Sequence, residues 1–471
     1  MVGITSLGFY VPVYRLARDE ISRAWKTRGA SGERAVAKFD EDSLTMAACA
    51  ALDCLKSAPQ SAIDSLFFGS TTPPYEEKQA ASIIGAIVDL DRETRTADFA
   101  GSLRAGTIAL AAAVDAVKSG AARNALVAVS DARMGAGKSR FEQQVGDGAV
   151  AMTIGSSDLI AAFEGSFSLF SELYDSWRPG QSAFVQSWEE RFVVTEGYMN
   201  AMERVISGIM HRYELTVKDF AKVVFYGPDK RSHSALARKL GFDLKTQVQD
   251  PLFDLIGNSG AAALPMMLVA ALSEARPGDR ILAANYGDGA DACILHATED
   301  TSLHRWKGRI EERLARRTYI DYERYLTWRN LVPLDQPRRP DLRLPAVPCL
   351  WRERKSVLAL YGSKCKRCGT VHYPPQRVCA GCRAKDEFEE YKLSDKRGHI
   401  FTYALDSLTA AVEQPAIIGV VDFEGGGRLA CEVAECEPSE IKIGMPVEMT
   451  VRKVGRTDTI QNYFWKARPA L

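Results

Sequence analysis

The sequence has no excess of charge of either sign. Lysine plus arginine and aspartate plus glutamate each total 60, so the formal net charge is zero. Without a global basic field, the composition offers no general attraction for a polyanion. We therefore expect no nucleic-acid partner, although a local basic patch would be compatible with this total.

Long apolar runs are also missing. No stretch reaches the roughly 18 apolar residues that a membrane span needs, and residues 1–15 have no basic segment before an apolar core. With 46% hydrophobic and 25% charged residues, the composition is that of an ordinary soluble globular protein, and 471 residues suffice for two or three domains. We expect a cytoplasmic protein without membrane contact.

The ten cysteines do not form a disulfide framework. Six are scattered through apolar or strand-like contexts, as inert core thiols usually are. The other four form two C-x2-C pairs, Cys365 with Cys368 and Cys379 with Cys382, ten residues apart. Four thiolates at this spacing suit tetrahedral zinc and leave no open coordination position, so we expect a structural Zn²⁺. Rubredoxin-like iron is the chemical alternative, and His372 is expected to be a loop residue.

Short apolar strands alternate with small-residue helices through the first 300 residues. The clearest unit has a strand at 65–69, an elbow at 98–107, a helix at 107–118 and a strand at 124–130. An all-apolar strand of this kind is typical of parallel sheets that are buried on both faces.

The same unit recurs about 156 residues later. The elbow at Gly101 matches residues 256–260, and residues 146–149 match residues 287–290. Two copies of a strand, elbow, helix and strand predict a duplicated α/β domain whose elbow helices are buried together. Residues 156–200 interrupt the pattern, and they are interpreted either as a cap over a pocket or as a plain structural insertion.

The remaining chain predicts a linker and two small modules. We divide the chain into a first domain at 1–304, a helical segment and proline-rich linker at 305–348, a zinc ribbon at 349–392 and a barrel at 393–471. Alternating strands in the last segment favour a small closed barrel of the oligonucleotide/oligosaccharide-binding (OB) type. Those strands are predicted at 399–405, 416–423, 428–433 and 446–454.

The first elbow has the features of a nucleophile site. A glycine-containing turn before a buried helix leaves N–H groups unpaired, and these can stabilise developing negative charge. The candidates here are Ser102, a hydroxyl with no base beside it in sequence, and Leu103, which has no reactive group. A hydroxyl without a base is a weak nucleophile, so Ser102 is interpreted mainly as a helix-entry residue.

The first 300 residues resemble the thiolase superfamily, in particular the hydroxymethylglutaryl-CoA synthases of archaeal type. The resemblance is carried by residues 104–107, 130–133 and 146–149, by Gly257-Asn258 and by Tyr286-Gly287. It implies an α-β-α-β-α thiolase fold, a coenzyme A thioester as substrate and a homodimer.

Residues from about 320 onward resemble zinc-ribbon and barrel proteins of the DUF35 acyl-CoA-associated type. Trp328-Arg329, Trp351, Gly362, residues 373–375 and the four cysteines carry this match. In related systems such a protein is a separate partner of a thiolase, whereas here the two are fused. A second thiolase-type subunit therefore remains a possible partner.

The resemblance also assigns positions to the family's catalytic groups. The family's cysteine nucleophile falls on Leu103, its glutamate base on Thr71 and its histidine on Tyr226, so all three are replaced. Asn258 matches the family's carbonyl-orienting amide. A leucine cannot form a thioester, which excludes an acyl-enzyme at position 103.

Three hypotheses follow for the function. The first is aldol, retro-aldol or Claisen-type chemistry on an acyl-CoA without an acyl-cysteine, with Tyr226 exchanging a proton at a carbonyl and Asn258 orienting that carbonyl. The second is a catalytically depleted scaffold subunit that binds acyl-CoA, in which Tyr226 is a core tyrosine. The third is condensation through Ser102. Glu76 or Glu77 could supply a displaced base, and His233 is a further residue to test.

Overall fold

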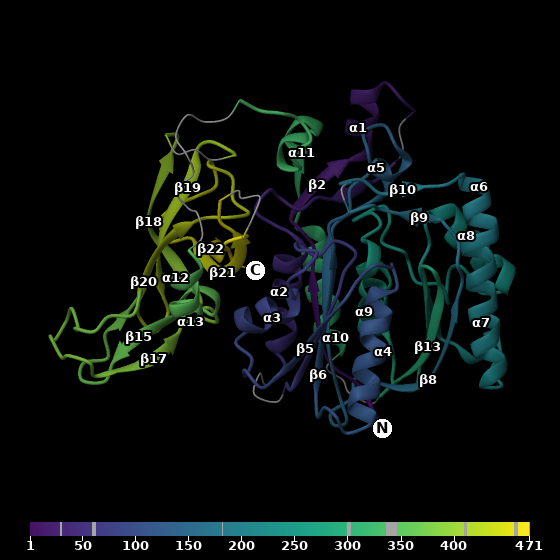
Figure 1. The fold of residues 1–471 in the computed structure, drawn as a ribbon, viewed down its shortest axis with the longest axis horizontal. Coiled ribbons are helices and arrows are strands. Elements are labelled where there is room, and N and C mark those ends of the chain that lie inside the picture. Colours follow the sequence, from purple (N-terminus) through teal and green to yellow (C-terminus); the bar gives the residue numbers. More distant parts are fainter. Residues whose placement is uncertain are drawn as a thin grey trace. The chain divides into compact units, whose positions relative to one another are not determined.

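The structure is a computed structural model in which the chain divides into two compact units (Figure 1). Unit 1 comprises residues 1–38, 42–85 and 90–326, and unit 2 comprises residues 39–41, 86–89 and 327–471. The residues that the structure describes are 1–28, 31–58, 63–180, 182–298, 303–335, 346–408, 412–455 and 460–470. The centre of the predicted proline-rich linker, 336–345, lies outside them.

Within the described residues, unit 1 is built on a nine-stranded sheet. The strands are β1 (Gly3–Tyr10), β4 (Ser65–Gly69), β5 (Arg95–Phe99), β6 (Ala125–Asp131), β7 (Gly148–Gly155), β8 (Ala161–Phe170), β11 (Lys222–Phe225), β12 (Arg280–Tyr286) and β13 (Gly289–Ala297). Their order in the sheet is β11-β12-β13-β8-β1-β7-β6-β4-β5.

This strand order confirms the predicted duplication. In the first half, β4 and β6 are parallel and β7 is antiparallel to β6; in the second half, β11 and β12 are parallel and β13 is antiparallel to β12. The two halves meet where β1 and β8 pair antiparallel. Strand β11 corresponds to β4. Val223 of β11 forms a parallel bridge with Val248, as β4 pairs in parallel with β5.

Residues 156–200 were expected to interrupt the sheet pattern, but the first part of this segment forms strand β8. It pairs with β13 along its length and with β1 at its start, so it is a full member of the sheet. Gly165 obscured this in the sequence, because a Cβ added there would lie 2.1 Å from the Tyr213 ring. The departure from the repeat begins after Phe170, with β9 (Ser176–Trp177), β10 (Gln186–Ser187), α6 (Glu190–Phe192) and a π-helix (Val193–Met199) that leads into α7 (Asn200–Arg212).

The two elbow helices are buried together in the core of unit 1, as predicted. They are α4 (Ala105–Lys118) and α9 (Ala263–Glu274), and Figure 1 shows them side by side. Glycine permits the contact, because a Cβ on Gly106 would lie 2.7 Å from the carbonyl oxygen of Ala261. The sites at the two elbows are thereby held against each other.

The other elements of unit 1 surround this core. A capping box between Asp42 and Thr45 starts α2, with the Thr45 N–H donating to Asp42 at 2.8 Å. These further elements are β2 (Tyr14–Ala17), α1 (Arg18–Trp25), β3 (Glu33–Ala35), α2 (Ser43–Leu55), α3 (Ala80–Ile87), α5 (Arg140–Gln144), α8 (Lys230–Leu240), α10 (Leu303–Ala315), β14 (Thr318–Ile320) and α11 (Tyr322–Trp328). The last two residues of α3 and of α11 belong to unit 2.

Unit 2 contains a three-stranded ribbon and a five-stranded sheet, ordered β16-β15-β17 and β20-β19-β18-β21-β22. A bridge between Val433 and Ala467 brings the end of β20 to β22, which closes the larger sheet into a barrel. The elements are α12 (Val347–Arg352), α13 (Arg354–Leu358), β15 (Tyr361–Cys365), β16 (Val371–His372), β17 (Phe388–Lys392), β18 (Gly398–Asp406), β19 (Ala416–Phe423), β20 (Arg428–Glu432), β21 (Pro446–Lys453) and β22 (Tyr463–Pro469).

Four barrel strands lie where the sequence predicts them, and β22 was missed. Its Lys466 and Arg468 are buried charges, which break the apolar alternation expected of a core strand. The Arg468 guanidinium pairs with Glu448 at 2.7 Å, which makes this burial possible. Among the described residues, no helix of either unit combines the length and the apolar character that crossing a membrane requires.

Candidate active site

The first elbow places Leu103 in an apolar cluster. The side chain is 8% exposed and belongs to the same buried cluster as Tyr198, Tyr226 and Tyr286. The Asn285 amide donates to the Leu103 carbonyl oxygen at 3.0 Å, which ties the elbow to the end of β12. Position 103 therefore contributes shape and hydrophobic contact to this region, and no acid, base or nucleophile.

Ser102 lies at the entry to α4. Its hydroxyl oxygen accepts from the Arg104 N–H at 3.3 Å, and its carbonyl oxygen accepts from the Ala105 N–H at 3.0 Å. Among the described residues, no histidine or carboxylate hydrogen-bonds to Ser102. This geometry suits a residue that satisfies the first backbone donors of a helix.

Thr71 is engaged by a buried carboxylate. Its hydroxyl and its backbone N–H donate to Asp131, at 2.8 and 2.7 Å. Asp131 is fully buried and also accepts from Ser70, from Thr72 and, at 2.7 Å, from the Ala261 N–H at the second elbow. These hydrogen bonds make Asp131 an anchor between the two elbows.

Tyr226 and Asn258 are brought together as a hydrogen-bonded pair. The Asn258 amide nitrogen donates to the Tyr226 hydroxyl oxygen at 2.9 Å, and the Asn258 amide oxygen accepts from the Gly260 N–H at 3.0 Å. The backbone contact fixes the orientation of the amide. Among the described residues nothing else pairs with the phenol oxygen, so its hydrogen remains available to a ligand oxygen.

Burial keeps the Tyr226 phenol protonated. The side chain is 4% exposed, and loss of hydration raises the pKa of Tyr226 above its usual value, although the Arg133 charge and the Asn258 hydrogen bond oppose this rise. The resting phenol is therefore a hydrogen-bond donor toward an oxygen, and not a phenolate base.

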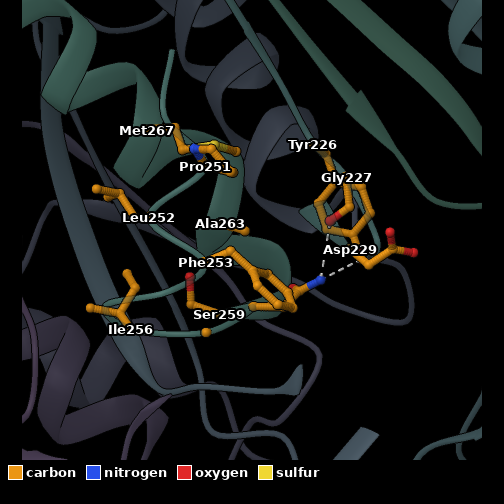
Figure 2. Close-up of a pocket in the computed structure, with 12 residues that line it drawn as sticks. Tyr226, Gly227, Asp229, Pro251, Leu252, Phe253, Ile256, Ser259, Ala263 and Met267 are labelled. Atoms are coloured by element: carbon orange, nitrogen blue, oxygen red, sulfur yellow. Dashed lines mark hydrogen bonds between the residues drawn. The ribbon is translucent and has the colours of Figure 1, made fainter. Parts of the chain in front are cut away.

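The pair lines a small, partly open pocket with a cavity volume of about 10 Å³, which is room for roughly one water molecule. In Figure 2, Tyr226 and Asp229 lie on one side, while Leu252 and Ile256 lie on the other. Most of the lining is apolar, with few polar groups. Its twelve residues are Tyr226, Gly227, Asp229, Pro251, Leu252, Phe253, Ile256, Gly257, Asn258, Ser259, Ala263 and Met267.

Three further polar residues near Tyr226 were missed in the sequence. Tyr198 donates its hydroxyl to the Tyr226 carbonyl oxygen at 2.8 Å and packs edge-to-face on Tyr286, with ring centroids 5.6 Å apart. Tyr286 hydrogen-bonds to Asp175, and burial raises the pKa of both groups. Asp175 comes from the segment after β8, so no local motif links it to the other three residues.

The other sequence candidates stand apart from the pocket lining. Glu76 and Glu77 are exposed. His233 is 2% exposed on α8 and stacks on Phe225 with ring centroids 4.5 Å apart; burial lowers its pKa to about 4, so its imidazole is neutral near pH 7. Its Nε2 has no hydrogen-bond partner among the described residues.

The four predicted metal-ligating cysteines converge in unit 2. The sulfur atoms of Cys365, Cys368, Cys379 and Cys382 all lie within 4.8 Å of one another. Tetrahedral bonds of about 2.3 Å place sulfurs about 3.8 Å apart, so this group fits zinc. A hydrogen bond from the Cys382 backbone lowers the pKa of Cys379 to about 5, which favours the thiolate that a metal needs. His372 is not part of this group.

Comparison with protein families identifies three segments of the chain. Residues 352–389 match the rubredoxin-like zinc ribbon domain of ChsH2, and residues 390–452 match the ChsH2 C-terminal OB-fold domain. Residues 210–296 match the C-terminal part of 3-oxoacyl-[acyl-carrier-protein] synthase III. These matches confirm the predicted zinc ribbon and OB-fold barrel.

Curated relatives extend the assignment across unit 1. The chain is 32% identical over 335 residues to the hydroxymethylglutaryl-CoA synthase of Pyrococcus horikoshii, covering 69% of this chain and 95% of that protein. Identity to the corresponding synthase of Methanopyrus kandleri is 32% over 337 residues, with 69% and 96% covered.

Solved structures share the fold. A hydroxymethylglutaryl-CoA synthase complexed with CoA aligns with a TM-score of 0.61 at 18% identity, covering 69% of this chain and 89% of that one. MvaS in complex with 3-hydroxy-3-methylglutaryl coenzyme A aligns with a TM-score of 0.62 at 23% identity, covering 73% and 94%. The chain belongs to the hydroxymethylglutaryl-CoA synthase family, with a ChsH2-type zinc ribbon and OB-fold domain fused after its thiolase-like domain.

Proposed function

We propose that this protein makes or breaks a carbon–carbon bond beside a CoA thioester, by aldol, retro-aldol or Claisen-type chemistry, without an acyl-cysteine. The observation that carries the proposal is the Asn258–Tyr226 hydrogen bond at the pocket, in a chain whose elbow presents Leu103. Relatives that are hydroxymethylglutaryl-CoA synthases support an acyl-CoA substrate. The zinc ion is structural in this account, because all four ligands are cysteines.

Tyr226 acts at the carbonyl that receives the new bond. Asn258 already donates to the phenol oxygen, so the phenol hydrogen points to the remaining partner, which is the substrate oxygen. In the aldol direction the carbonyl oxygen gains this proton as the carbon–carbon bond forms, and in the cleavage direction the proton returns. Donors placed in a buried site stabilise such developing charge strongly.

We assign the removal of the α-proton of the acyl-CoA to Asp175, which hydrogen-bonds to Tyr286. Burial raises the pKa of Asp175, which makes its carboxylate a stronger base than an exposed aspartate. In the aldol direction the α-proton of the acyl-CoA passes to Asp175, and the Tyr226 proton passes to the new hydroxyl. Solvent then reprotonates Tyr226 and accepts the proton from Asp175, so the sum is acyl-CoA plus carbonyl compound giving a hydroxyacyl-CoA.

A scaffold subunit is the second candidate function. It is favoured by Leu103 and by Thr71, whose hydroxyl is already donated to Asp131. In that case the pocket binds an acyl-CoA and the chain supports an active thiolase-type partner, beside the homodimer that the family resemblance implies.

Intact-protein mass spectrometry, combined with product analysis, separates these functions. The full-length protein is incubated with short and aromatic acyl-CoAs, alone and together with aldehydes, ketones or oxo acids. We expect carbon–carbon bond products and no acyl adduct on the protein. An adduct on Ser102 would overturn the noncovalent mechanism, and activity that appears only after a second thiolase chain is added would favour the scaffold.

A further inference from the structure

Arg133 is a buried cation beside the second elbow. It follows β6, is 6% exposed, and its Cδ lies 2.7 Å from the place that a Cβ on Gly260 would occupy. Gly260 is the residue whose N–H orients the Asn258 amide. Of the neighbouring charges, Arg133 is the one that most strongly opposes the raised pKa of Tyr226. The guanidinium therefore lies close to the Tyr226–Asn258 pair.

Arg133 has no ion pair and no hydrogen bond among the residues that the structure describes. Asp131, the carboxylate nearest in sequence, is occupied by hydroxyl and N–H donors and forms no ion pair with Arg133 within 4.0 Å. A similarly buried arginine, Arg313, pairs with Asp53 at 2.8 Å. The Arg133 guanidinium therefore has no anionic partner among the described residues, and an anion that reached it would form a charge-assisted pair.

We propose that Arg133 binds a carboxylate carried by the carbonyl partner of the reaction, so that this partner is an oxo acid and not a neutral aldehyde or ketone. The inference rests on the proposed function of the Tyr226 site. In the cleavage direction, the same carboxylate lies at the far end of the hydroxyacyl chain of the CoA thioester.

A carboxylate near the reacting carbon fits this position better than a phosphate of CoA. Arg133 acts electrostatically on Tyr226, the group that contacts the reacting carbonyl in our mechanism. CoA carries its phosphates at the other end of the pantetheine arm, away from the thioester. A planar guanidinium also matches a carboxylate through two parallel hydrogen bonds, which adds geometric selectivity.

Isothermal titration calorimetry on the full-length protein tests this binding without requiring turnover. The probes are pyruvate, acetoacetate and levulinate, each compared with its methyl ester, and free CoA. We expect at least one acid to bind at least about tenfold more tightly than its ester, and Arg133→Met to remove this preference. CoA affinity is expected to change less than about threefold.

Arg140→Met is the matched control. Arg140 also acts on the pKa of Tyr226, but it is already paired with Glu190, so its replacement should keep the preference for the acid. Thermal unfolding of both variants checks that they fold. Equal binding of acid and ester, absence of acid binding, or an Arg133→Met variant that loses only CoA affinity would each overturn the proposal. Turnover of neutral carbonyl compounds with equal efficiency would overturn it too, while leaving the proposed function intact.

Discussion

Tyr226 combines three properties that suit proton donation to a substrate oxygen. It is buried, its phenol oxygen accepts from Asn258, and its pKa is raised, so the phenol stays protonated near neutral pH. Leu103 packs nearby and supplies no competing nucleophile. At the scale of single residues, these properties support the proposed proton transfer by Tyr226 without an acyl-cysteine at position 103.

His233 gives a pH-dependent prediction at the residue scale. Its folded pKa of about 4 lies below the usual value of about 6.5, so between these pH values the unfolded chain binds a proton that the folded protein does not. Acidification through this window therefore favours unfolding, by up to about 3 kcal/mol, and this contribution to stability is fully present above pH 6.5.

The measurement is thermal unfolding of the wild-type protein and His233→Gln between pH 7.5 and 4.5. We expect the wild-type melting temperature to fall more steeply with acidification than that of the variant. Parallel pH profiles would show that His233 does not titrate as its burial implies.

Part of the site was predictable from single residues and part was not. Ser102 stood out as a hydroxyl at a glycine-containing elbow, and the family resemblance assigned roles to Leu103, Thr71, Tyr226 and Asn258. By contrast, no role near Tyr226 was predicted for the following residues, which come from separate segments that only the folded chain brings together: Arg133, Asp175, Tyr198 and Tyr286.

At the scale of elements, the contact between the two elbow helices depends on a missing side chain. Gly106 lies in α4, where a Cβ would meet the Ala261 carbonyl oxygen at 2.7 Å and a Val129 methyl carbon at 2.8 Å. One of these atoms belongs to the backbone of the second elbow, so a larger residue would push the two elbows apart.

Gly106→Ala is therefore expected to destabilise unit 1 by about 1–3 kcal/mol, as overpacking of a close contact usually does. Gly85→Ala is the matched control, since Gly85 also lies in a helix and a Cβ there meets only a Leu66 methyl carbon at 3.6 Å. This control should be neutral or stabilising by about 0.5–1 kcal/mol. Denaturant unfolding measures both, and equal effects of the two changes would contradict the predicted packing.

The elements also show where sequence patterns fail. Repeated apolar strands and glycine elbows predicted the doubled sheet, because burial on both faces leaves a clear pattern. Strand β8 was hidden by Gly165, which is needed where Tyr213 packs on the sheet, and β22 was hidden by buried Lys466 and Arg468. In each case a tertiary contact changed the residue type that a strand would otherwise carry.

At the scale of the whole molecule, one chain carries a thiolase-like domain and a zinc-ribbon and OB-fold module. The ribbon has a small core around its cysteines, formed by Ala384 and the partly buried Phe388. So small a core depends on its metal for stability.

We expect one zinc ion per chain, measured by plasma mass spectrometry. Cys379→Ser should remove it and lower the stability of the ribbon by roughly several kcal/mol, seen as protease sensitivity of unit 2. Cys349→Ser is the control, because Cys349 is exposed and lies outside the group of four. Bound iron, or a stable ribbon without metal, would contradict a structural zinc site.

Noncovalent chemistry at Tyr226 is tested most directly by the rate of carbon–carbon bond formation or cleavage in Tyr226→Phe. This change removes the phenol oxygen and retains the buried ring. We expect the rate to fall by about 10²–10⁴-fold, with affinity for the CoA thioester within about threefold of wild type. A rate within threefold of wild type would show that the phenol does not take part in the reaction.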